Sequence, residues 1–263
     1  MDLGLKNRTA VVCAASSGLG FATARELAAE GARVVICARR DEKLQAARQA
    51  IIAETKADVR AVAADLATTA GIEAVARAAE QAFGPVDILV NNTGGPPSGP
   101  FEKLTWELWQ QHVDNLLRST VELTRRVLPG MRERKWGRVL NVTSITVKQP
   151  VDGLMLSNSL RAAVTGFART LATEVAKDGV TVNCILPGFT KTERVEHLNA
   201  ATAEREGVPL AQVQARTEGQ IPMGRLGDPR EFGALAAFLV SERASYITGQ
   251  SVAVDGGWIR GLY

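Results

Sequence analysis

The sequence has few of the residues that build metal sites, disulfide frameworks or membrane spans. Its 263 residues include three cysteines and two histidines, with no Cys-x-x-Cys pair, so a structural zinc site is not expected. Cys13, Cys37 and Cys184 all lie in short apolar runs, which predicts buried free thiols in a reducing cytoplasm. No apolar run approaches the roughly 20 residues that a membrane-spanning helix needs.

An excess of charge of one sign is also lacking. The formal net charge is +3, from 31 basic and 28 acidic residues scattered along the chain, which argues against a nucleic-acid partner. The first ten residues hold charges but no apolar signal core, so we expect a cytoplasmic protein. The length and the 46% apolar content favour one large α/β domain spanning residues 1–263.

Short apolar runs alternate with longer amphipathic segments along the whole chain. This alternation predicts a doubly wound, Rossmann-type parallel sheet of about seven strands with helices on both faces. The strands are apolar throughout, as expected when both faces of the sheet are covered. The expected strands are 9–15, 33–38, 59–64, 86–91, 138–142, 180–186 and 251–254, and the expected helices are 20–29, 41–55, 69–83, 106–132, 156–177 and 229–240.

One long irregular stretch, residues 187–228, interrupts this pattern. It contains two short helix-like pieces and follows directly after a predicted strand. A connection of this length inside a compact domain is usually functional, and we expect a substrate lid. A plain surface insertion is the alternative.

A glycine-containing turn follows the first predicted strand. It comprises Ser16, Ser17, Gly18, Leu19 and Gly20 and leads into a helix. Glycine lets the backbone approach a diphosphate, and a helix N-terminus offers unpaired N–H groups and the positive end of its dipole. An ordinary tight strand–helix turn is the alternative, but the position in the first βαβ unit favours dinucleotide binding.

The end of the second predicted strand carries arginine where an NAD-binding protein would carry an acid. Arg39 and Arg40 precede the first carboxylate, Asp41. An arginine here is suited to the 2′-phosphate of NADP(H), so NADP(H) is favoured over NAD(H). A solvated pair of arginines is the alternative.

Several further motifs, in order along the whole chain, resemble the short-chain dehydrogenase/reductase family, and in particular its 3-oxoacyl-acyl-carrier-protein reductase-like members. They are the turn at 13–20, Asp65, the run 91–94, the run 137–144, 182–183 with 187–188, and 248–250 with 255–257. The resemblance implies a homo-oligomer, a tetramer or a dimer, acting on a small carbonyl or alcohol substrate. It further implies that Asp65 and Leu66 frame the adenine, that Asn92, Thr93 and Gly94 line the adenosine ribose, and that Pro187, Gly188, Thr190 and Thr192 flank the nicotinamide and diphosphate.

The chain departs from the family at its reactive residues. Ser144 matches the family serine, but Ser157 stands at the tyrosine position and Arg161 at the lysine position of the Tyr-x-x-x-Lys pair. Leu116 falls at the asparagine position of the fifth helix. Asn115 comes one residue early, which would turn it away by about 100° unless the helix bulges. In addition, Ala14 replaces the first glycine of the family's turn.

Tyrosine is scarce in the whole chain. The two tyrosines are Tyr246, for which a packing role is expected, and Tyr263, the last residue. A serine hydroxyl is a much weaker acid than a phenol, and Arg161 stays protonated, so it can hold an oxyanion but not relay a proton. Two hypotheses stay open: an NADP(H)-dependent oxidoreductase with Ser144, Ser157 and Arg161 as a reduced catalytic set, or a catalytically silent, regulatory nucleotide-binding oligomer.

Overall fold

A computed structural model describes residues 1–262, and Tyr263 lies outside the described residues. Seven parallel strands form a sheet in the order β3-β2-β1-β4-β5-β6-β7, so the strand order reverses between β1 and β4. This confirms the doubly wound α/β fold. The strands are β1 (Thr9–Cys13), β2 (Arg33–Ala38), β3 (Val59–Ala63), β4 (Ile88–Asn91), β5 (Gly137–Val142), β6 (Val180–Pro187) and β7 (Ser251–Val254).

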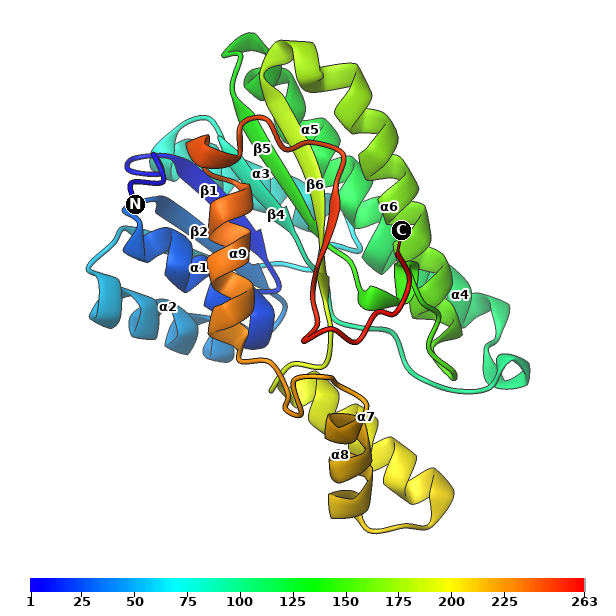
Figure 1. Ribbon diagram of the computed structural model, residues 1–263. Coiled ribbons are helices and arrows are strands. Elements are labelled where there is room, and N and C mark those ends of the chain that lie inside the picture. The colour runs from blue at the N-terminus through cyan, green and yellow to red at the C-terminus, as the bar shows by residue number, and fades with distance from the viewer. Residues whose placement is uncertain (263) are drawn as a thin grey trace.

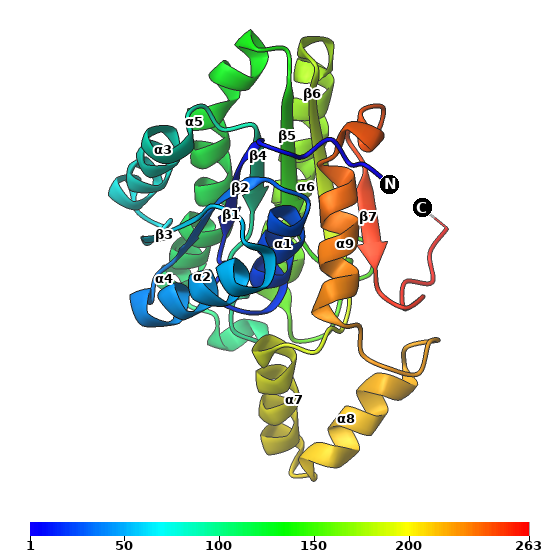
Figure 2. The same cartoon turned by 90° about the vertical axis from the view of Figure 1, so that its left-hand side faces the viewer.

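Helices cover both faces of the sheet (Figure 1 and Figure 2). Helices α1, α2 and α9 pack on one face, and α3, α5 and α6 pack on the other. Successive strand residues point to opposite faces, so Val12 joins the first apolar cluster and Val11 the second. The helices are α1 (Gly18–Ala29), α2 (Asp41–Thr55), α3 (Thr69–Phe83), α4 (Trp106–His112), α5 (Ser119–Glu133), α6 (Met155–Val175), α7 (Glu193–Glu206), α8 (Leu210–Gly219) and α9 (Pro229–Leu239).

The expected helix 106–132 is wrong as one regular element. It consists of α4, a π-helical turn at Val113–Arg118 and α5. In a π-helix each N–H bonds one residue further back than in an α-helix, which locally accommodates one extra residue. This turn therefore resets which residues face the interior.

The helix α6 buries a narrower stripe than its large apolar residues suggest. Leu156, Leu160 and Val164 are buried, and Ala168, Ala172 and Val175 continue the stripe toward the C-terminal end. The larger Phe167 and Leu171 are only half-buried, and with Val121 and Leu128 they line a groove between α5 and α6.

Helices α7 and α8 project from the body of the molecule as a pair (Figure 1). The two ends of this excursion are hydrogen-bonded to each other, because Lys191 N donates to Gly227 O and Gly227 N donates to Phe189 O, each at 2.9 Å. Both helix-like pieces expected within residues 187–228 are thus present. No helix within residues 1–262 is long and apolar enough to cross a membrane.

Candidate functional site

A cavity of about 1030 Å³ opens where the carboxyl ends of the strands meet. In a doubly wound sheet this edge, beside the reversal of strand order, is where ligands bind. Every site residue selected from the sequence lines this cavity, although their roles stay predictions. They are Ser16, Ser17, Gly18, Leu19, Gly20, Arg39, Arg40, Asp65, Leu66, Asn92, Thr93, Gly94, Ser144, Ser157, Arg161, Pro187, Gly188, Thr190 and Thr192.

The glycine-containing turn is tightly constrained. Ala14 adopts φ +49°, the left-handed region, where a side chain costs roughly 1–2 kcal/mol. A Cβ built at Gly20 would lie 2.3 Å from the backbone oxygen of Ala14, so the close approach of turn and helix requires glycine there. The N-cap residue of α1, Ser17, makes no side-chain cap hydrogen bond, which leaves the first N–H groups of the helix for an anion.

Two exposed arginines lie at the end of the cavity that is formed by the loops after β2 and β3. Arg39 and Arg40 follow β2 and are both exposed. Asp65 follows β3, and its Oδ1 accepts a hydrogen bond from the backbone N–H of Ala67 at 3.0 Å, which orders the loop that includes Leu66. These residues could hold the adenosine end of a nucleotide with a phosphate beside Arg39.

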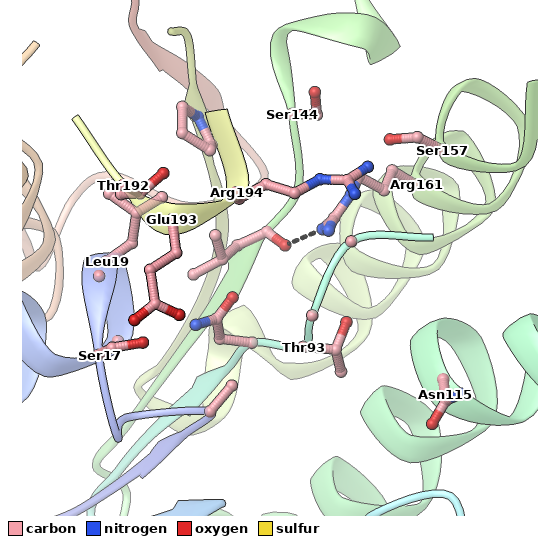
Figure 3. Close-up of a pocket in the computed structure, with 18 of the residues that line it drawn as sticks. Ser17, Leu19, Thr93, Asn115, Ser144, Ser157, Arg161, Thr192, Glu193 and Arg194 are labelled. Atoms are coloured by element: carbon pink, nitrogen blue, oxygen red, sulfur yellow. Dashed lines mark hydrogen bonds between the residues drawn. The ribbon is translucent and has the colours of Figure 1, made fainter. Parts of the chain in front are cut away.

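Ser144, Ser157 and Arg161 lie together on the opposite side of the cavity (Figure 3). The Oγ of Ser144 accepts a hydrogen bond from the N–H of Thr146 at 3.2 Å. Ser157 and Arg161 are one turn apart on α6, with exposed fractions of 6% and 9%. Nη1 of Arg161 donates to the backbone oxygen of Val142 at 2.7 Å, which fixes the guanidinium beside the end of β5.

Arg161 remains a cation at neutral pH. Burial, and secondarily the nearby charge of Arg194, lower its pKa to about 10. That value is still far above neutrality, so the side chain can stabilise negative charge on a ligand but does not exchange a proton there.

The helix bulges at Asn115, which is the condition under which this residue was expected to face the site. The π-helical turn places Asn115 on the cavity wall, whereas Leu116 is buried with Leu156 and Leu160 in a small apolar cluster. Asn115 nevertheless lies on a separate helix from Ser157 and Arg161, at the edge of the close-up in Figure 3.

Sequence reasoning missed His112 and Arg194, which also lie on the cavity wall. Arg194, near the start of α7, reaches across the cavity toward Arg161 (Figure 3), and its Nη2 donates to the backbone oxygen of Pro96 at 2.5 Å. His112 ends α4, and its Nδ1 is buried without a hydrogen-bond partner among the described residues. Neither carries a sequence signal, because each is defined by contacts between distant segments.

Neither tyrosine supplies a phenol that the structure places in the cavity. Tyr246 is fully exposed, so its expected packing role is wrong, and Tyr263 is not among the described residues. The three cysteines are free and buried, as expected. Within residues 1–262 no cluster of three or more His, Cys, Asp or Glu side chains is arranged to hold a metal.

Comparison with known proteins adds a consistent set of relatives. Residues 13–259 match the family model described as "Enoyl-(Acyl carrier protein) reductase". The chain is 36% identical to the 3-oxoacyl-[acyl-carrier-protein] reductase of Vibrio cholerae, covering 97% of this chain and 98% of that protein. It is also 36% identical to the D-beta-hydroxybutyrate dehydrogenase of Cupriavidus necator, covering 97% and 99%. Among solved structures, L-sorbose reductase from Gluconobacter frateurii in complex with NADPH and L-sorbose superposes with a TM-score of 0.94, at 35% identity and full coverage of both chains.

Proposed function

This chain belongs to the short-chain dehydrogenase/reductase family of oxidoreductases, and from that premise we propose that it binds NADP(H) and interconverts a carbonyl and an alcohol in a substrate of the 3-oxoacyl type. The observation that carries this proposal is the shared cavity. Arg39 and the turn at Gly18–Gly20 line its coenzyme half, and Ser144, Ser157 and Arg161 line its reaction half.

The coenzyme half fits NADP(H) on three features of the chain. There is no room for a side chain at position 20 between α1 and Ala14. The side chain of Ser17 makes no capping hydrogen bond at the N-terminus of α1, and Arg39 is exposed at the end of β2. The first two suit a diphosphate and the third suits a 2′-phosphate. The NADPH complex of L-sorbose reductase supports the same coenzyme.

The reaction half would do the electrostatic work of carbonyl reduction. When bound, NADPH supplies the hydride, which adds to the carbonyl carbon, and a proton must then reach the carbonyl oxygen. Ser144 and Ser157 would donate hydrogen bonds to that oxygen, and the charge of Arg161 would stabilise it as it becomes an alkoxide. The proton would come from water, because neither serine nor Arg161 titrates near neutral pH.

The first experiment separates coenzyme binding from turnover. We expect NADPH fluorescence titration to give a micromolar Kd and NADH a clearly weaker one. Single-turnover assays with 3-oxoacyl thioesters, 3-oxo acids, ketones and aldehydes should then detect slow reduction that Ser157→Ala diminishes. Ser159→Ala is the matched control, because Ser159 is an exposed residue on the same helix. If neither NADPH nor NADH binds, the proposal is refuted.

The silent, regulatory alternative rests on a single observation, the serine and arginine at the Tyr and Lys positions. It predicts NADPH binding with no turnover on any substrate of the panel. Turnover that Ser157→Ala leaves untouched would instead show that Ser157 does not stabilise the carbonyl oxygen and that another group does.

Two architectural roles complete the proposal. The α7–α8 excursion would act as the lid, supported by its hydrogen-bonded base and by Thr192, Arg194 and Leu198 on the cavity wall. The apolar groove between α5 and α6 would join copies of the chain into a dimer or tetramer, which light scattering at micromolar concentration would test.

A further inference from the structure

Two arginines meet in the reaction half without an acidic partner. Arg161 comes from α6 and Arg194 from the first turn of α7, and their side chains converge in Figure 3. Each donates one hydrogen bond, in both cases to a backbone oxygen, that of Val142 or that of Pro96. Neither forms an ion pair with any carboxylate of residues 1–262. A guanidinium carries five N–H donors, so most donors of this pair have no protein acceptor.

The loop after β4 is shaped around Arg194. A Cβ built at Gly95 would lie 2.6 Å from Nε of Arg194 and 2.9 Å from its Cζ. The guanidinium therefore lies against bare backbone, where only glycine leaves it room, and the next residue, Pro96, supplies the acceptor. This contact and the hydrogen bond to Pro96 hold the half-buried side chain of Arg194 on the cavity wall.

The pair is costly unless an anion joins it. Arg161 is 9% exposed, and buried charges in proteins are normally paired. Burial lowers the pKa of Arg194, and burial together with Arg194 lowers that of Arg161, which indicates two desolvated, mutually repelling cations. The two acids on the cavity wall are engaged elsewhere: Glu193 pairs with Lys43 at 3.3 Å, and Asp65 orders its own loop.

We propose that Arg161 and Arg194 form a carboxylate-binding subsite, so that the substrate is a small oxo acid or hydroxy acid with a free carboxylate. This inference rests on the proposed function and narrows its substrate from 3-oxoacyl compounds in general to the free acids. Arginine favours a carboxylate because its planar fork makes two parallel hydrogen bonds to the two oxygens.

The spacing on α6 limits where the carboxylate lies. Ser157, beside the reacting oxygen, and Arg161 are separated by about 6 Å along the helix axis. Arg161 thus begins about one helical turn from Ser157, which favours a small acid whose carboxylate is one or two carbon atoms from the carbonyl, as in a 2-oxo or a 3-oxo acid. A thioester is neutral at this position and would leave both guanidinium groups without a counter-charge.

The test compares an acid with its neutral ester. Calorimetric titration of acetoacetate and of methyl acetoacetate is carried out on the full chain, both coenzyme-free and saturated with NADP⁺. For the wild-type protein we expect acetoacetate to bind at least about 10-fold more tightly than the ester, the size of effect that hydrogen bonds to charged groups produce. Arg194→Met should abolish this preference while leaving the NADPH Kd unchanged within about twofold.

Two further variants make the result specific. Gly95→Ala keeps both charges but displaces the Arg194 guanidinium, so it should also weaken acetoacetate and not the ester. Arg77→Met removes one exposed positive charge from α3, away from the cavity, and should change neither ligand.

Three outcomes would overturn the inference. Equal binding of acid and ester by the wild type would remove the subsite, whether or not NADPH binds. An acid preference retained in Arg194→Met would remove Arg194 from it. A loss of NADPH affinity in Arg194→Met as large as the loss of acetoacetate affinity would assign the pair to the coenzyme diphosphate. Failure of NADPH to bind the wild type, with acetoacetate still preferred, would refute the proposed function alone.

Discussion

The coenzyme half and the reaction half of the cavity are both built from loops that follow parallel strands, yet they use charge differently. In the coenzyme half the arginines are exposed at the rim, and the tight contacts are between backbone segments, as at Gly20 and Ala14. In the reaction half Arg161 is buried, Arg194 is half-buried, and both are anchored to backbone oxygens. The first arrangement suits a ligand that brings several phosphates, whereas the second suits one small anion held away from water.

The difference also shows how a fold can keep dinucleotide binding while its proton-transfer residues change. Binding a dinucleotide depends on backbone geometry, which the turn retains even with Ala14 in a left-handed conformation. Proton transfer depends on single side chains, and serine at position 157 removes the phenol without disturbing α6. We therefore expect substitutions in the reaction half to change rates and substrate affinity, and substitutions in the coenzyme half to change coenzyme affinity.

The largest expected effect comes from restoring the family pair. In Ser157→Tyr/Arg161→Lys, a phenol with a lysine one turn away regains general-acid character, because the cation favours the phenolate. General acid–base catalysis typically contributes 10²–10⁴-fold, so the single-turnover rate with a neutral ketone should rise by about that factor. Stopped-flow fluorescence of NADPH oxidation measures it.

Each single variant is the control for that pair. Ser157→Tyr alone and Arg161→Lys alone should each give much less than the double variant, since the two groups act as a unit. Leu116 is left unchanged, because it packs against Leu156 and Leu160 and an asparagine there would be buried. An unchanged rate in a well-folded double variant would show that the reaction half lacks more than these two side chains.

The second-largest expected effect is on coenzyme affinity and comes from Arg39 in the coenzyme half. Arg39→Ala should weaken NADPH by about 10- to 100-fold, the range expected for losing a charge-assisted hydrogen bond, and leave NADH unchanged. Fluorescence titration of both coenzymes is the measurement. Arg230→Ala, an exposed arginine on α9 outside the cavity, is the matched control. Equal weakening of both coenzymes would mean that Arg39 does not read the 2′-phosphate.

The sequence predicts the fold far better than it predicts the reaction half. Continuous apolar strands and amphipathic helices are local signals, and the strand limits differ from the prediction by at most two residues, as at 86–91 against Ile88–Asn91. The coenzyme half is likewise local, because each of its residues directly follows a strand. The π-helical turn between α4 and α5 has no such signal in the sequence. Because of this turn, Asn115 rather than Leu116 lines the cavity.

Arg194 illustrates the same limit more strongly. In the sequence it is one of several charged residues in an irregular stretch, and only the fold brings it to Gly95 and Arg161. Likewise, Ala168 and Ala172 rather than the larger Phe167 and Leu171 face the sheet from α6, because the space between α6 and the sheet admits only small side chains there. Contacts between distant segments, not residue types, determine these features.

The smallest expected effect is a pH dependence of stability confined to the reaction half. Burial, and secondarily the charge of Arg194, lower the pKa of His112 below its usual value of about 6.5. The unfolded chain therefore binds a proton more readily than the folded chain as the pH falls through 6.5, so His112 makes the free energy of unfolding decrease toward acid pH. His112→Gln should flatten this decrease between pH 7.5 and pH 5.5, measured as the shift of the urea midpoint. A slope in His112→Gln equal to that of the wild type would show that His112 does not carry the acid sensitivity.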